Sequence, residues 1–143
     1  MGQPIALVVD DSMLIRHTVC RFLEQRGFSV TSATNGVEAM LILESVLPDL
    51  IVTDLMMPKM TGEQLITAVK DNPVTSRVPV VVLAGRSSAR EMKPEERADY
   101  VIFKDIDIEK QLLKALSLTL GPQHAQNRGA PGTPLGEAAN TVS

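Results

Sequence analysis

Five short runs of apolar residues, most of them β-branched or small, constrain the fold more than any other feature of this sequence. They lie at residues 5–9, 28–33, 50–52, 80–83 and 101–103. Four of these runs are apolar at every position, which is typical of parallel strands that are buried on both faces. In the run 28–33 apolar and polar residues alternate, and this pattern also predicts a strand.

Longer stretches with apolar residues at helical spacing separate these runs. They lie at residues 12–26, 36–46, 62–71 and 108–120. A further stretch, 87–98, is charged and contains a proline, so we expect a short or broken helix there. Strands that alternate with helices predict an α/β fold, a doubly wound five-stranded parallel sheet with helices on both faces.

The last part of the chain differs in composition from the rest. Residues 121–143 are rich in glycine and proline, and their only large aliphatic residues are Leu135 and Val142. Such a segment buries too little apolar surface to offset the entropy of ordering it. With 143 residues in all, we expect one domain over residues 1–120 and a flexible tail over residues 121–143.

Charge and composition exclude several classes of protein. Fourteen Lys and Arg against seventeen Asp and Glu give a net charge of −3, and there is no Trp, one Tyr and three Phe. A nucleic-acid binder usually needs a basic face or stacking aromatic residues, so we expect no nucleic-acid partner. One cysteine excludes an internal disulfide. No apolar run is long enough to cross a bilayer and no secretory signal is present, so we expect no membrane association and a cytoplasmic location.

Charged residues end three of the predicted strands. Asp10 and Asp11 follow the first strand, Asp54 ends the third and Lys104 follows the fifth. In an open α/β sheet, ligands bind beyond the carboxyl ends of the strands, so these side chains are expected to meet. Crowded carboxylates repel each other, and a hard divalent cation such as Mg²⁺ relieves that repulsion. One carboxylate then remains to attack phosphorus and form an acyl phosphate, while the cation and the lysine neutralise the transferring group.

Two motifs and a lysine resemble the receiver domain of two-component response regulators: the run Val8–Ser12, the nonamer Asp54–Gly62 and Lys104. The resemblance covers residues 5–120 and implies a flavodoxin-like fold. It implies that Asp54 accepts a phosphoryl group from a phosphohistidine on a sensor histidine kinase or a histidine phosphotransfer protein. It also implies that Asp10 and Asp11 hold Mg²⁺ together with the Asp54 carboxylate and the main-chain carbonyl of Met56, and that Lys104 contacts the phosphoryl oxygens.

Three positions depart from the family pattern. Ala84 stands where the family usually has Thr or Ser, Val101 where it usually has an aromatic residue, and Asp105 where proline usually follows the lysine. Tyr100 is next to Val101, but neighbouring residues of a strand point to opposite faces. Our hypothesis is that phosphate is accepted and then signalled by another route, through the Mg²⁺ site and the loop after Asp54.

Several functions remain open from the sequence. The leading one is a phosphoacceptor switch that is not an enzyme in its own right and signals by protein contact to an unidentified target. The alternative is a degenerate receiver that binds a partner without being phosphorylated. A hydrolase with an aspartyl-phosphate intermediate usually has a second acid two residues after the nucleophile, where this chain has Met56. A nucleotide site is disfavoured because no glycine follows the first strand. Whether the domain dimerises through its last helix is left open.

Overall fold

The computed structural model describes residues 2–55, 57, 59–85, 98–104 and 107–120. Within these residues the strands are β1 (Ile5–Val9), β2 (Ser29–Ala33), β3 (Leu50–Asp54), β4 (Val80–Ala84) and β5 (Tyr100–Phe103), and the helices are α1 (Met13–Glu24), α2 (Gly36–Leu43), α3 (Gly62–Asp71) and α5 (Ile108–Thr119). The five strands form one sheet in the order β2-β1-β3-β4-β5, and every pair is parallel. The predicted α/β architecture is confirmed, and this strand order is that of a flavodoxin-like doubly wound sheet.

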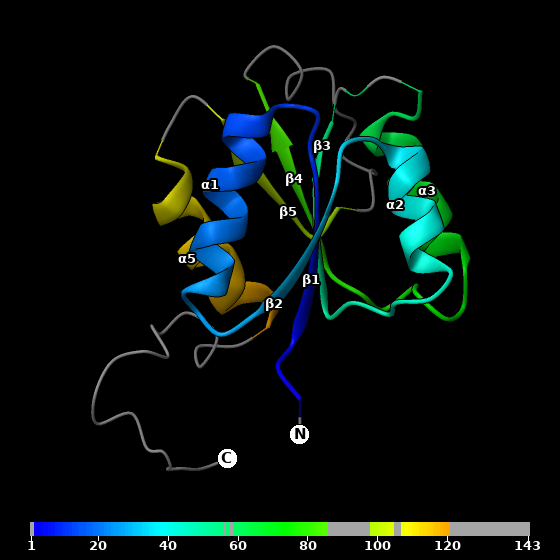
Figure 1. Cartoon of the computed structure of the whole chain (residues 1–143), viewed down its shortest axis with the longest axis horizontal. Coiled ribbons are helices and arrows are strands. Elements are labelled where there is room, and N and C mark those ends of the chain that lie inside the picture. The colour runs from blue at the N-terminus through cyan, green and yellow to red at the C-terminus, as the bar shows by residue number, and fades with distance from the viewer. Residues whose placement is uncertain (1, 56, 58, 86–97, 105–106, 121–143) are drawn as a thin grey trace.

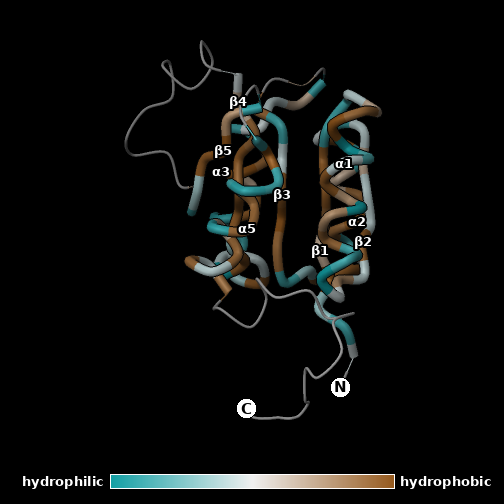
Figure 2. Tube along the Cα trace, turned by 90° about the vertical axis from the view of Figure 1, so that its left-hand side faces the viewer, coloured by the Kyte–Doolittle hydropathy of each residue, from teal (hydrophilic) through white to brown (hydrophobic). Residues whose placement is uncertain are grey.

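The helices cover the sheet in two layers. Helices α1 and α5 lie against one face, and α2 and α3 lie against the other (Figure 1). The central strands are mostly hydrophobic along their length, whereas the helices alternate between hydrophobic and hydrophilic residues (Figure 2). This difference follows from burial, because a central strand is covered on both faces and each helix on only one.

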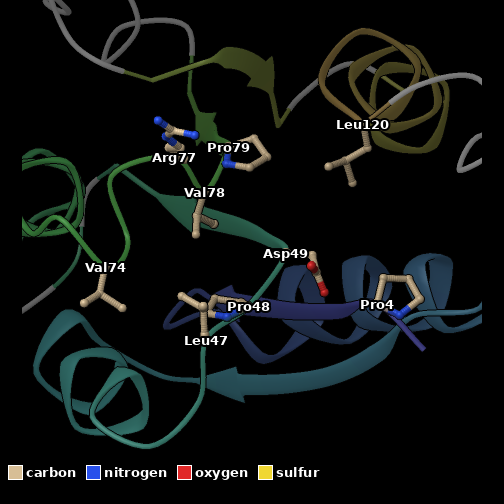
Figure 3. Close-up of a pocket in the computed structure, with 9 residues that line it drawn as sticks. All are labelled: Pro4, Leu47, Pro48, Asp49, Val74, Arg77, Val78, Pro79 and Leu120. Carbon is tan, nitrogen blue, oxygen red and sulfur yellow. The ribbon is translucent and has the colours of Figure 1, made fainter. Parts of the chain in front are cut away.

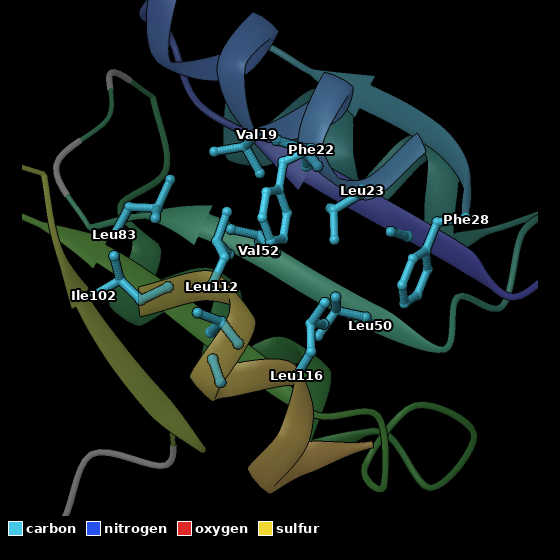
Figure 4. Packing of buried hydrophobic residues seen from close by; sticks show 14 residues of the cluster. Val19, Phe22, Leu23, Phe28, Leu50, Val52, Leu83, Ile102, Leu112 and Leu116 are labelled. Atoms are coloured by element: carbon cyan, nitrogen blue, oxygen red, sulfur yellow. The ribbon is translucent and has the colours of Figure 1, made fainter. Parts of the chain in front are cut away.

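Two apolar cores hold these layers together. On one side of the sheet, Phe22 and Leu23 of α1 and Leu112 and Leu116 of α5 pack against residues such as Val52 (Figure 4). Leu23, Val52, Leu112 and Leu116 are completely buried. Truncating a leucine of this kind to alanine typically costs 2–5 kcal/mol of stability. These packed helices fix the strands whose ends carry the polar residues.

The predicted element boundaries are close to the observed ones. Helix α1 ends at Glu24, and the predicted stop at Gly27 is a residue with a φ of 91° that carries the chain into β2. Ser12 caps α1 as predicted, since its side chain accepts a hydrogen bond from the Ile15 amide. Strand β5 begins one residue earlier than predicted, at Tyr100. The predicted short helix at 87–98 and the predicted tail at 121–143 fall outside the described residues, apart from Ala98.

The strand order places the polar strand ends at a switch point. The chain leaves β1 toward β2 on one side, and β3 lies on the other side of β1. The carboxyl ends of β1 and β3 therefore border a crevice, the usual ligand site in sheets of this type. In the part of the chain that the structure describes, no helix is long and apolar enough to cross a bilayer.

Candidate functional site

Asp10 is a buried carboxylate held in one orientation. It follows β1, its side chain is fully buried, and its amide donates a hydrogen bond to the Ala33 carbonyl. Its Oδ1 accepts a hydrogen bond of 2.8 Å from the amide of Ser12. Its Oδ2 is also buried, and its charged neighbour is the Lys104 ammonium at 3.3 Å. A buried carboxylate is costly unless positive charge compensates it, so this carboxylate is suited to a cationic environment.

Three carboxylates meet at the ends of β1 and β3. Asp10, Asp11 and Asp54 each offer an oxygen within 4.8 Å of the others. Asp10 and Asp54 are buried and Asp11 is exposed, so the cluster opens to solvent on one side. An all-oxygen set with access to water is the kind of site that Mg²⁺ prefers, since Mg²⁺ keeps several water ligands. The residues present therefore fit a magnesium ion.

Lys104, which follows β5, joins this cluster from beyond β4. Its Nζ lies 2.9 Å from Asp54 Oδ1 and 3.3 Å from Asp10 Oδ2, and its side chain is 23% exposed. Burial opposes the charged form, but the hydrogen bond to Asp54 and the two negative charges outweigh it and raise the pKa of Lys104 above its usual 10.5. The ammonium is thus firmly charged beside Asp54 at neutral pH.

Burial dominates the titration of Asp10. Desolvation raises the pKa of Asp10 above its usual 3.8, and the neighbouring Asp54 charge raises it further. The Ser12 amide and the Lys104 charge lower it, but they do not cancel the increase. A cation bound among these acids would favour the ionised form of Asp10.

The main chain at Gly62 lies very close to the main chain of Asp54 and Leu55. The Gly62 amide donates a hydrogen bond of 2.8 Å to the Leu55 carbonyl. A Cβ at position 62 would collide with the Asp54 carbonyl and come within 2.8 Å of the Leu55 Cα. Only glycine allows this approach, so Gly62 sets the path of the main chain at Asp54. Met56, whose carbonyl was predicted as a metal ligand, and Pro58 lie outside the described residues.

The strands β4 and β5 carry the departures from the family pattern. Ala84 ends β4, is buried and pairs with Phe103. Tyr100 packs into the core beneath α1 and α5, whereas Val101 packs into the core beneath α2 and α3. The prediction that Tyr100 and Val101 face opposite sides is confirmed, so the tyrosine does not occupy the place of the missing aromatic residue. Asp105 lies outside the described residues.

Two polar residues near the site escaped the sequence analysis. Arg16 of α1 donates a hydrogen bond of 2.8 Å to the main-chain carbonyl of Asp10. Gln111 of α5 pairs with the main chain of Phe103, directly before Lys104. Each is a polar residue within an amphipathic helix, and no spacing in the sequence distinguishes it from a solvent-facing one.

A hollow of about 410 Å³ lies at the other end of the strands, near the starts of β1, β3 and β4 (Figure 3). Its lining includes residues at the starts of strands and the end of α5, namely Pro4, Leu47, Pro48, Asp49, Val74, Arg77, Val78, Pro79 and Leu120. The Asp49 carboxylate is engaged there by the Ile5 amide at 2.8 Å. The three clustered carboxylates and Lys104 lie at the other edge, where the strands end.

Comparison with known families finds a match to one protein family over most of the chain. The profile of the response regulator receiver domain matches residues 6–117. That range contains all four residues of the cluster, Asp10, Asp11, Asp54 and Lys104.

Similar proteins are response regulators and other receiver-containing proteins. The response regulator Rre1 of Synechocystis is 39% identical over 88 residues, which are 60% of this chain and 38% of that protein. The gliding motility regulatory protein of Myxococcus xanthus is 36% identical over 87 residues, which are 61% of this chain and only 11% of that protein. The chain therefore spans a minor part of these relatives.

Solved receiver structures share the fold. The receiver domain of a signal transduction histidine kinase from Syntrophus aciditrophicus is 30% identical, with a TM-score of 0.72, and the match covers 82% of this chain and 91% of that one. The chemotaxis response regulator CheY4 of Vibrio cholerae is 29% identical, also with a TM-score of 0.72, and the match covers 81% and 98%.

Proposed function

The chain belongs to the response regulator receiver domain family of two-component systems, and from this premise we propose that Asp54 accepts a phosphoryl group from a phosphohistidine. The donor is a sensor histidine kinase or a histidine phosphotransfer protein. The observation that carries the proposal is the setting of the Asp54 carboxylate, which is buried, 2.9 Å from the Lys104 ammonium and beside two further carboxylates.

The proposed step is an in-line displacement at phosphorus. A carboxylate oxygen of Asp54 forms the new phosphorus–oxygen bond while the phosphorus–nitrogen bond of the donor breaks, and that electron pair returns to the imidazole. The ammonium of Lys104 neutralises charge on the phosphoryl oxygens, which is most of what such a transfer requires of a protein. Burial of the Asp54 side chain strengthens this attraction, because the effective dielectric constant is lower there than in water.

Asp10 and Asp11 are proposed to hold Mg²⁺ together with the Asp54 carboxylate and the Met56 carbonyl. The meeting of these three carboxylates, two of them buried, supports this assignment. The ion would supply positive charge to the transferring phosphoryl group and relieve repulsion among the acids.

The receiver family is generally a signalling domain rather than an enzyme. We propose that the message here passes by protein contact and that any catalysis is limited to the domain's own phosphorylation and dephosphorylation. Because Ala84 lacks the hydroxyl and Val101 the aromatic ring of the usual family pattern, we propose that the phosphoryl group acts on the acids and the loop after Asp54.

The test is the intact mass of the chain after incubation with acetyl phosphate and Mg²⁺. We expect a gain of one phosphoryl group that is lost in Asp54→Asn and in excess chelator. The matched control is Asp71→Asn, which alters an exposed aspartate at the far end of α3 and should leave uptake unchanged. Absence of uptake by the unaltered chain would contradict the proposal and favour the alternative, a degenerate receiver, which Ala84 and Val101 motivate.

A further inference from the structure

We propose that Gln111 is a positioning residue that holds Lys104 within reach of Asp54 and of the phosphoryl group. The inference rests on the proposed function of that site and extends it to a residue on another element. Gln111 lies near the start of α5, and its side-chain hydrogen bonds join it to Phe103 and Asp107. It acts through Phe103, the residue directly before Lys104.

The side-chain amide of Gln111 engages both main-chain groups of Phe103. Its Oε1 accepts a hydrogen bond of 3.0 Å from the Phe103 amide, and its Nε2 donates one of 2.9 Å to the Phe103 carbonyl. Within the described residues β5 is an edge strand, so these two groups have no neighbouring strand on that side. The glutamine amide thus pairs with β5 as one residue of a further strand would.

The opposite side of the same short segment is fixed by β4. The Lys104 amide donates a hydrogen bond of 2.9 Å to the Ala84 carbonyl, and Phe103 pairs with Ala84 in the sheet. The main chain at Phe103 and Lys104 is therefore held from both sides, by β4 and by Gln111. These hydrogen bonds restrain the main chain from which the Lys104 side chain reaches Asp54 and Asp10.

Other contacts of α5 also hold the Gln111 side chain in place. Its Nε2 also donates to the Asp107 carbonyl at 3.2 Å, and Asp107 caps α5 through the Lys110 amide. The next residue, Leu112, is completely buried in the core shared with Ile102. The amide is thus presented by a helix that is packed against the sheet.

The residue after Lys104 does not supply a comparable restraint. Asp105 follows Lys104 where the family usually has proline, so no proline ring restricts the main chain after the lysine. A long, flexible lysine side chain loses its reach if its main chain shifts, and a displacement of about 1 Å at a reacting centre can cost 10²-fold in rate. Gln111 supplies by hydrogen bonding a restraint that the sequence after Lys104 lacks.

The test combines Gln111→Leu with Lys104→Ala in a double-mutant cycle. We expect Gln111→Leu to slow phosphoryl uptake from acetyl phosphate by about tenfold and to have almost no effect in the Lys104→Ala background, because both changes act through the same ammonium. The matched control, Lys114→Leu, alters an exposed residue of the same helix and should change neither rate. An equal loss in both backgrounds would overturn the positioning role.

A second readout does not depend on phosphorylation. Hydrogen exchange of the Lys104 amide, which is bonded to Ala84, should accelerate several-fold in Gln111→Leu, while amides of β1 and β3 keep their protection. Gln111→Glu keeps the acceptor and loses the donor, so it should fall between Gln111→Leu and the unaltered chain. Unchanged exchange at Lys104 in Gln111→Leu would overturn the inference. If the unaltered chain takes up no phosphoryl group, the proposed function fails, and exchange alone decides the role of Gln111.

Discussion

The two sides of the crevice differ in how closely they follow the family pattern. On the acidic side, formed by Asp10, Asp11 and Asp54, every charged residue expected from the resemblance is present and the three acids meet. On the β4–β5 side, Lys104 reaches Asp54, but Ala84 and Val101 replace the hydroxyl and the aromatic ring. The difference suggests that accepting a phosphoryl group and transmitting its presence depend on separate residues, so one can persist while the other changes.

The two sides also differ in their mechanical support. The strands of the acidic side, β1 and β3, each have a strand on both sides, whereas β5 is an edge strand among the described residues. Lys104 therefore depends on β4 and on Gln111 for its position. The following predictions test this contrast, from the largest expected effect to the smallest.

Asp11→Ala should cause the largest loss. Asp11 is exposed, so its removal should leave the free energy of unfolding in chelator nearly unchanged. It removes one proposed ligand of Mg²⁺, and we expect phosphoryl uptake at a fixed Mg²⁺ concentration to fall by about 10²-fold. Uptake rates measured across a Mg²⁺ titration check this. A rate equal to that of the unaltered chain would contradict the role of Asp11 as a ligand of Mg²⁺.

Gly62→Ala should damage the acidic side through the main chain. The added Cβ meets the Asp54 carbonyl and comes within 2.8 Å of the Leu55 Cα, and main-chain atoms cannot rotate away. Overpacking of this kind costs about 1–3 kcal/mol of stability. Urea denaturation checks the loss. The control is Ala68→Gly in the same helix, which should cost only about 1 kcal/mol through helix propensity. A smaller loss for Gly62→Ala than for the control would contradict the close approach.

The pH dependence of stability in chelator should reveal the burial of Asp10. Since the folded pKa of Asp10 lies above its usual 3.8, the folded state binds this proton more tightly than the unfolded state does. Ionised Asp10 therefore costs stability at neutral pH, and the cost disappears as pH falls through the raised pKa to below 3.8. The unaltered chain should gain stability relative to Asp10→Asn over that fall in pH. A constant difference between their unfolding free energies would contradict the assignment.

The smallest effect is expected on the β4–β5 side. With beryllofluoride as a phosphoryl mimic, hydrogen exchange should slow at amides near Asp54 and change by less than about twofold in β4 and β5. Ala84→Thr restores a hydroxyl at the end of β4 and should increase the response of those strands. An equally strong response on both sides of the crevice in the unaltered chain would remove the contrast.

The sequence was sufficient for the architecture and for the acidic cluster. Apolar runs such as 80–83 predict buried strands, because few other structures bury every side chain of a short run. The meeting of Asp10 with Asp54 follows from parallel strands that end at one edge of the sheet. These features depend on periodicity and topology, which a sequence expresses directly.

Contacts between side chains and the main chain were not predictable in the same way. The pairing of Gln111 with Phe103 and the bond from Arg16 to the Asp10 carbonyl depend on the distance between a helix and a strand. The nonamer identified Gly62, but not its approach to the Asp54 carbonyl. Such distances arise from the packing of the whole domain and leave no periodic pattern in the sequence.

The central claim is that Asp54 is the residue that becomes an acyl phosphate. Borohydride reduces an acyl phosphate to an alcohol, so treatment after incubation with acetyl phosphate and Mg²⁺ should convert Asp54 to homoserine. Peptide mapping by mass spectrometry locates the change. We predict homoserine at position 54 and an unmodified aspartate at positions 10 and 11. Homoserine at another position, or at none, would contradict the account.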